Sequence, residues 1–164
     1  MQETQQTYVK MGLDAWNNMV KRTDKVLNDI SDEQMLHDTA PGRNSGIYLL
    51  GHLTAVNDGM LKILDLGDRQ YPELDEVFLR SPDKSGKEMP DAATLRGYWA
   101  ASKENLNEGF AKMEPADWFG RHMSVNEEDF EKEPHRNKLN VLIGRTIHLS
   151  EHYGQLVYLT KKGE

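Results

Sequence analysis

The chain has 164 residues, a formal net charge of −7 and no cysteine. This length is typical of one domain that encloses its own core, so we expect a single domain over residues 1–164. The absence of cysteine excludes disulfides, thiolate catalysis and cysteine-ligated metals, which leaves imidazole and carboxylate as metal ligands. The acidic charge argues against a nucleic-acid partner, because proteins that bind phosphate backbones usually carry a basic face.

The N-terminal residues are polar and lack the basic start and apolar run of a signal peptide. No apolar stretch approaches the length of a membrane span. We therefore expect a cytoplasmic protein without membrane contact.

Four segments carry the spacing of apolar residues that is typical of amphipathic helices. In chain order they cover about residues 4–27, 45–64, 91–113 and 137–160. The second is expected to begin at an N-cap, Asn44 or Ser45, and to stop at Gly67. Pro115 follows the third helix, and Lys161-Lys162-Gly163 is a typical C-terminal signature for the fourth.

The segments between these helices are long and rich in turn residues. Ser31-Asp32-Glu33-Gln34 has the pattern of a capping box and predicts a short helical turn after the first helix. Residues 66–90 and 114–136 show no helical or alternating pattern. The sequence therefore predicts an all-α fold, a four-helix bundle with long connections after the second and third helices.

Two histidines in the fourth segment, His148 and His152, lie one helical turn apart on the same face. A third, His52, lies in the second segment. Imidazoles that converge in this way can bind one divalent metal and leave a coordination position open. Small residues near them on each helical wheel (Ala55, Gly59 and Gly144) indicate a hollow beside the rings.

Other interpretations of these histidines stay open. They could be ordinary buried side chains whose polar atoms are satisfied by neighbours. His148 to His152 also fits the His-x-x-Glu-His signature of inverted zincins, in which Glu151 would be the general base. Such enzymes need a further ligand downstream, so we keep this as a minor alternative. The remaining histidines, in loops or at segment ends, are expected on the solvated surface: His37, His122 and His135.

Three polar residues are candidates for roles beside the metal. Tyr48 and Gln155 each fall within about 40° of a histidine on their helical wheels, so we expect them to line the pocket. Glu151 is the only nearby carboxylate in the fourth segment, and it is the default catalytic base if the reaction is hydrolysis.

Gly51-His52-Leu53 and His148-x-x-x-His152-x-Gly154-Gln155 make the chain resemble the DinB/YfiT-like superfamily of four-helix-bundle metalloproteins, named after DNA-damage-inducible proteins. The likeness covers essentially the whole chain. It implies that nickel or zinc is bound by His52, His148 and His152, with water completing the shell, and that the protein forms a homodimer. Many members have arginine where this chain has Tyr153, which leaves the subfamily open.

The resemblance implies two kinds of chemistry, since members include transferases that use low-molecular-weight thiols and others described as metal-dependent hydrolases. The function expected here is a metal-dependent enzyme, a thiol S-transferase or a hydrolase, that acts on a small-molecule substrate or thiol. The alternatives are a non-catalytic binding protein with a structural metal and a bundle that binds no metal.

Overall fold

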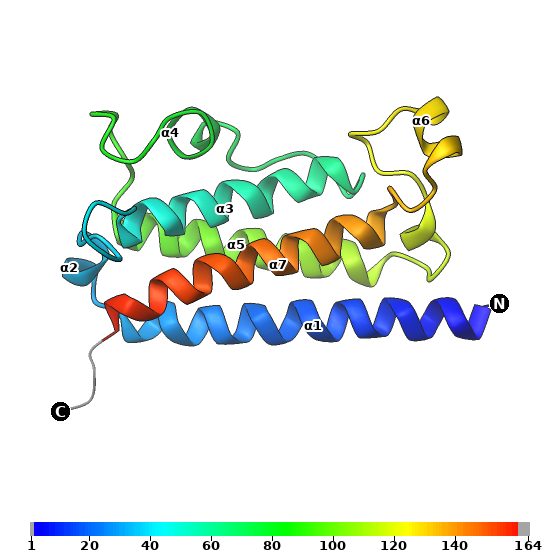
Figure 1. Cartoon of the computed structure of the whole chain (residues 1–164), viewed down its shortest axis with the longest axis horizontal. Coiled ribbons are helices and arrows are strands. Elements are labelled where there is room, and N and C mark those ends of the chain that lie inside the picture. Colours follow the sequence, from blue (N-terminus) through cyan, green and yellow to red (C-terminus); the bar gives the residue numbers. More distant parts are fainter. Residues whose placement is uncertain (1, 161–164) are drawn as a thin grey trace.

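The computed structural model describes residues 2–160, and within them it contains helices and connecting segments but no strand (Figure 1). The four long helices are α1 (Gln2–Asp29), α3 (Gly46–Ile63), α5 (Ala92–Ala111) and α7 (Lys138–Leu156). The short ones are α2 (Asp32–Met35), α4 (Leu74–Phe78), α6 (Glu127–Lys132) and the 3-10 turns η1 (Asp117–Phe119) and η2 (Val157–Leu159). The predicted all-α bundle is confirmed. None of the described helices combines the length and apolar character needed to cross a membrane.

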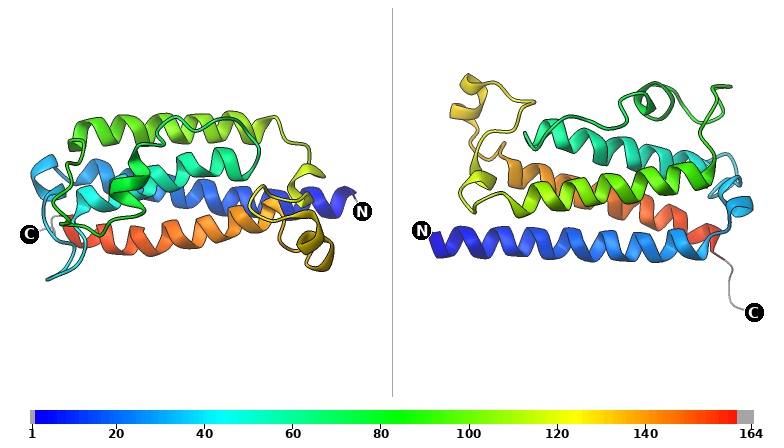
Figure 2. Two further views of the ribbon diagram at one scale, coloured as in Figure 1. Left: turned by 90° about the horizontal axis from the view of Figure 1, so that it is seen from above. Right: turned by 180° about the vertical axis from the view of Figure 1, so that it is seen from behind.

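The long helices pair in two parallel layers, α1 with α7 and α3 with α5 (Figures 1 and 2). Gly12 of α1 lies against Leu139 at the start of α7, so these two helices run in the same direction. Leu66, just after α3, packs against Gly109 near the end of α5, so this pair is parallel as well. The first half of α3 consequently faces the second half of α7.

Both long connections are present, and each has a distinct path. Residues 64–91 run back along the bundle and carry α4, which packs on α3 (Figure 2). Residues 112–137 fold over the other end of the bundle, where the Met123 amide donates to the Ile63 carbonyl at 2.9 Å. Because the first connection crosses the length of the bundle, α5 can start at the same end as α3.

Helix starts follow their capping residues closely. Ser31 and Gln34 form the predicted capping box, with reciprocal hydrogen bonds of 2.8 and 3.2 Å. Ser45, rather than Asn44, caps α3 by accepting the Tyr48 amide at 3.3 Å. Each side-chain cap satisfies an amide that the first helical turn leaves without a partner.

Helix ends were predicted less well. The expected stop of the second helix at Gly67 is wrong, because α3 ends at Ile63 and Asp65 adopts the left-handed conformation, with φ of 58°. The last helix also ends early, at Leu156, and continues as the 3-10 turn η2. The predicted terminal signature, Lys161-Lys162-Gly163, lies outside the described residues.

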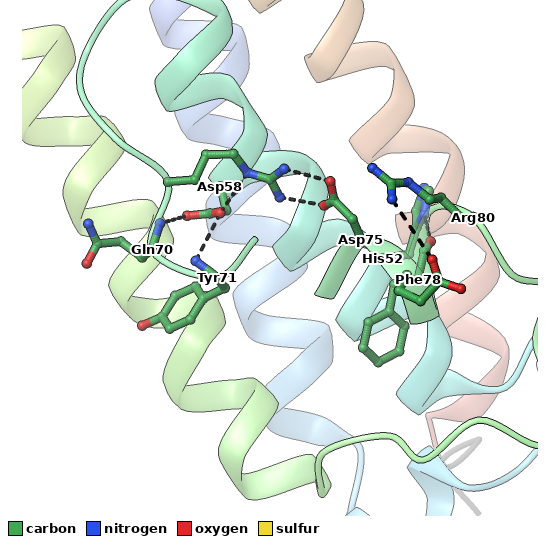
Figure 3. A network of polar contacts seen from close by, with 9 residues as sticks. His52, Asp58, Gln70, Tyr71, Asp75, Phe78 and Arg80 are labelled. Atoms are coloured by element: carbon green, nitrogen blue, oxygen red, sulfur yellow. Dashed lines mark hydrogen bonds and ion pairs between the residues drawn. The ribbon is translucent and has the colours of Figure 1, made fainter. Parts of the chain in front are cut away.

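A buried carboxylate fixes the crossing connection to α3. Asp58 is fully buried and accepts the backbone amides of Gln70 and Tyr71 at 2.7 and 3.1 Å (Figure 3). It also accepts the Arg69 Nε at 3.0 Å, and Arg69 in turn forms a bidentate pair with Asp75 in α4 at 2.5 and 2.7 Å. A buried charge needs partners of this kind, so residues 69–75 are anchored to one point on α3.

Further along this connection, Phe78 at the end of α4 packs against the backbone of α3. A Cβ atom added to Gly51 would lie 2.3 Å from the Phe78 ring, so glycine alone permits this approach. The ring is completely buried, so it has little room to move. Gly51 therefore determines how closely α4 lies on α3.

We expect Gly51→Ala to lower the free energy of unfolding by about 1–3 kcal/mol, because the added methyl group overpacks the contact with Phe78. Urea denaturation followed by circular dichroism measures the change. Gly97→Ala is the matched control, since a Cβ added there meets nothing within 4 Å. That variant should gain about 0.5–1 kcal/mol from helix propensity. A Gly51→Ala protein as stable as the wild type would contradict the packing argument.

Candidate metal centre

Three histidines converge between α3 and α7. The Nε2 atom of His148 lies 3.0 Å from that of His52 and 3.1 Å from that of His152. One ligand nitrogen from each ring lies within 4.8 Å of the other two. The antiparallel course of α3 and α7 causes this meeting, because it places the first turns of one beside the last turns of the other.

The rings of His52 and His152 are oriented by hydrogen bonds that their Nδ1 atoms make on the side away from His148. His52 Nδ1 lies 2.9 Å from the Phe78 carbonyl oxygen, and His152 Nδ1 lies 2.8 Å from Gln155 Oε1 (Figure 3 shows the first). Both oxygens can only accept, so each Nδ1 carries the proton and each Nε2 is left with its lone pair. Those lone pairs point toward His148. Outer hydrogen bonds of this kind fix metal-binding imidazoles in the correct tautomer.

The pKa of His148 lies far below the ordinary value of an imidazole. Burial, and then the neighbouring His152, His52 and Arg145, together lower it from 6.5 to about 4. Burial also lowers the pKa of His52. The neutral form of imidazole binds metals, so the low pKa values favour binding at neutral pH.

The donor set fits a divalent metal of the nickel or zinc class. Two metal–nitrogen bonds of about 2.0–2.1 Å hold their nitrogens no more than about 4.2 Å apart, and the two separations that involve His148 satisfy this limit. Without a cation, the three Nε2 atoms would face each other. Those of His52 and His152 are fixed as acceptors, and His148 could donate a proton to only one of the two. The buried Nδ1 of His148 has no partner among residues 2–160, so no protein group there fixes the tautomer of its ring.

The three polar residues expected at the pocket have different surroundings. Tyr48 is buried and stacks nearly parallel to His52, and its hydroxyl donates to the Ser81 carbonyl at 2.7 Å. Gln155 is exposed and contacts the site through His152. Glu151 is also exposed. Tyr48 and Gln155 thus support the histidines from outside.

A cavity of about 470 Å³ opens beside two of the histidines; we call it the histidine cavity. Its polar lining is cationic, and its other walls are apolar. The residues that line it are His52, Ala55, Val56, Gly59, Lys62, Ile63, Arg69, Leu79, Arg145 and His148. Ala55 and Gly59 therefore contribute to the hollow as expected, while Gly144 lines a neighbouring one of about 320 Å³.

Two features of the site were missed in the sequence. The contact of the Phe78 carbonyl with His52 cannot be recognised in the sequence, because it depends on the path of the crossing connection. Arg145 could have been found, since it precedes His148 by three residues and His152 by seven, and these spacings share one helix face.

The histidines outside the cluster follow expectation with one exception. His37 and His135 are exposed. The prediction that His122 is solvated is wrong, because it is half-buried beside Gly144 and Arg145, where its Nδ1 accepts the Ser124 amide at 3.2 Å. It takes no part in the three-histidine cluster.

Comparison with known proteins gives one informative result. A comparison with curated proteins finds no match. The sequence model of the DinB superfamily matches residues 15–156, which spans all three histidines and most of the bundle. The chain belongs to the DinB superfamily.

Proposed function

We propose that this protein binds one divalent metal through His52, His148 and His152 and uses it to act on a small molecule held in the histidine cavity. The observation that supports this most strongly is the convergence of three Nε2 atoms, two of them on histidines that line that cavity. A structural metal is usually enclosed by four protein ligands, whereas a catalytic one keeps a position for substrate. Three protein ligands beside a cavity favour the second class.

The chemistry that a bound ion supplies is Lewis acidity, which lowers the pKa of water or of a thiol. The chain itself contributes orientation. The Phe78 carbonyl and Gln155 hold His52 and His152 in the tautomer that presents Nε2. Ala55, Val56 and Ile63 exclude water from one side of the cavity. These features suit either transfer from a low-molecular-weight thiol or hydrolysis.

The remaining parts of the proposal rest on the residues and on the family. Imidazole ligands suit nickel and zinc, and we propose one of these as the natural metal. We also propose a cytoplasmic homodimer. Glu151 is the candidate base for hydrolysis, but its exposed position makes thiol transfer, which does not need it, the favoured reaction.

We expect His148→Ala and His152→Ala to lose tight metal binding while retaining helical content. The bundle is stabilised by its buried apolar residues, most of which lie away from the histidines. Metal content after dialysis, together with circular dichroism, measures both effects. His135→Ala, at an exposed histidine, is the control and should bind metal normally. A His148→Ala variant that failed to fold would indicate a structural metal.

Acid should destabilise the metal-free protein through His148. Its pKa is about 4 in the folded protein against an ordinary value of 6.5, so between these values the unfolded chain binds more protons. The free energy of unfolding should consequently fall as the pH is lowered from 6.5 to 4, and metal affinity should fall over the same range. Urea titrations at several pH values measure the slope. An equal slope in His148→Ala would contradict this assignment.

The reaction can be identified by offering the metal-loaded protein a low-molecular-weight thiol with an electrophilic acceptor and, separately, ester and amide substrates. We expect turnover with the thiol, and we expect it to survive Glu151→Gln because Glu151 is exposed. The metal-free protein and His152→Ala are the controls for metal dependence. Ester or amide turnover that is lost in Glu151→Gln would support hydrolysis instead. No turnover with any substrate would leave a metal-binding protein.

A further inference from the structure

Arg145 is a half-buried cation at the histidine cavity, and it has no partner within the described part of the chain. It lies on α7, one turn before His148, and lines the cavity together with His52 and His148. Its guanidinium forms no hydrogen bond or ion pair with any residue from 2 to 160. Burial lowers the pKa of Arg145, and its charge lowers the pKa values of His52 and His148. A partly desolvated guanidinium beside two imidazoles is costly unless something balances its charge.

The other two cations at the cavity are in different situations. Arg69 is held by two carboxylates, Asp58 and Asp75, so its charge is balanced and all three of its nitrogens donate a hydrogen bond. Lys62 has a side chain that is 70% exposed, and it lies 3.8 Å from the carboxylate of the still more exposed Asp68. Arg145 alone combines partial burial with free hydrogen-bond donors.

The remaining walls and the volume of the histidine cavity indicate the size and polarity of the ligand that it can hold. Among the described residues no carboxylate lines it, and its other walls are the apolar side chains of Ala55, Val56, Ile63 and Leu79 with the bare backbone of Gly59. Its volume of about 470 Å³ lies within the usual range for small-molecule sites, about 300–1,000 Å³. The cavity therefore suits a short apolar segment that ends in a negative charge.

We propose that the histidine cavity selects small organic acids, with Arg145 binding the ligand's carboxylate while the opposite end of the ligand reaches the three histidines. This inference rests on the proposed metal-dependent function, because it describes the substrate class of the same site. Guanidinium is suited to the task, since its planar donors match a carboxylate in a bidentate pair. The role of Arg145 is binding and orientation of the ligand.

The first test uses the cobalt(II)-loaded protein and two thiols of similar size, 3-mercaptopropionate and 2-mercaptoethanol. Visible absorption of the cobalt ion reports thiol binding without any turnover. The carboxylated thiol should bind about tenfold more tightly or better, as expected for a charge-assisted hydrogen bond to a partly desolvated guanidinium. Arg145→Gln should remove this preference, so that the two thiols bind with similar affinities. Equal affinities in the wild type would overturn the proposal.

Lys62→Gln is the matched control, because it removes one positive charge from the same cavity at its exposed rim. It should retain most of the preference for 3-mercaptopropionate. If Lys62→Gln abolished the preference as fully as Arg145→Gln, the general positive field would be responsible and the assignment to Arg145 would be wrong. Raising the salt concentration should affect a rim charge more than a half-buried one.

A second test separates this inference from the metal. The metal-free protein is titrated with butyrate and with 1-butanol while the amide signal of Gly59 and the Nε–H signal of Arg145 are followed by NMR. Butyrate should shift both signals at concentrations at which butanol does not, and Arg145→Gln should lose the shift of Gly59. If cobalt does not bind but butyrate does, the proposed metal function fails and the anion site stands. If cobalt binds but butyrate shifts neither signal, only the anion site fails.

Discussion

The candidate centre depends on hydrogen bonds that two histidines make on the side away from the cluster. His52 and His152 donate from Nδ1 to oxygen acceptors, and this fixes both Nε2 lone pairs toward His148. Three imidazoles in this arrangement repel one another unless a proton or a cation lies between them. The single proton of neutral His148 can lie between only two of the three rings. The lowered pKa of His148 disfavours a second proton on its ring near neutral pH. A divalent cation resolves the conflict for all three rings together.

This orientation links the site to the path of a distant segment. The carbonyl that accepts from His52 belongs to Phe78, at the end of the connection that crosses back over α3. Asp58 and Arg69 anchor that connection at one point, and Gly51 lets Phe78 approach the helix at another. Tyr48 adds a third contact by donating to the Ser81 carbonyl. The crossing connection thus supports the three-histidine cluster from outside and also links two helices.

The sequence predicted the parts of this protein that depend on local patterns. Apolar periodicity located the four long helices. The types and spacing of Ser31 and Gln34 predicted their capping box, and the spacing of His148 and His152 placed both rings on one helix face. Each of these signals is contained within a few turns of helix. That His52 lies close to the other two histidines could be predicted only from the bundle fold. The apolar stripes and the resemblance to a family together indicated that fold.

What could not be predicted depends on contacts between distant segments. The hydrogen-bond acceptor at Phe78 is a backbone carbonyl, which every residue has, so the sequence does not indicate which residue provides it. The end of α3 was predicted at the wrong residue, because the chain turns at Asp65, a non-glycine residue in the left-handed conformation. The direction of α5 follows from the crossing path of residues 64–91, which has no periodic pattern. Arg145 is different. The sequence shows that it shares a helix face with His148 and His152, but only the structure shows that no carboxylate among residues 2–160 pairs with it.

We propose that histidines from α3 and α7 share a single divalent ion. Anomalous scattering from crystals of the protein, grown with zinc or nickel and recorded at the absorption edge of the metal, can locate this ion. We expect one strong peak about 2.0–2.2 Å from the Nε2 atoms of His52, His148 and His152. A peak elsewhere on the protein, or a cluster without a peak at full metal loading, would contradict it.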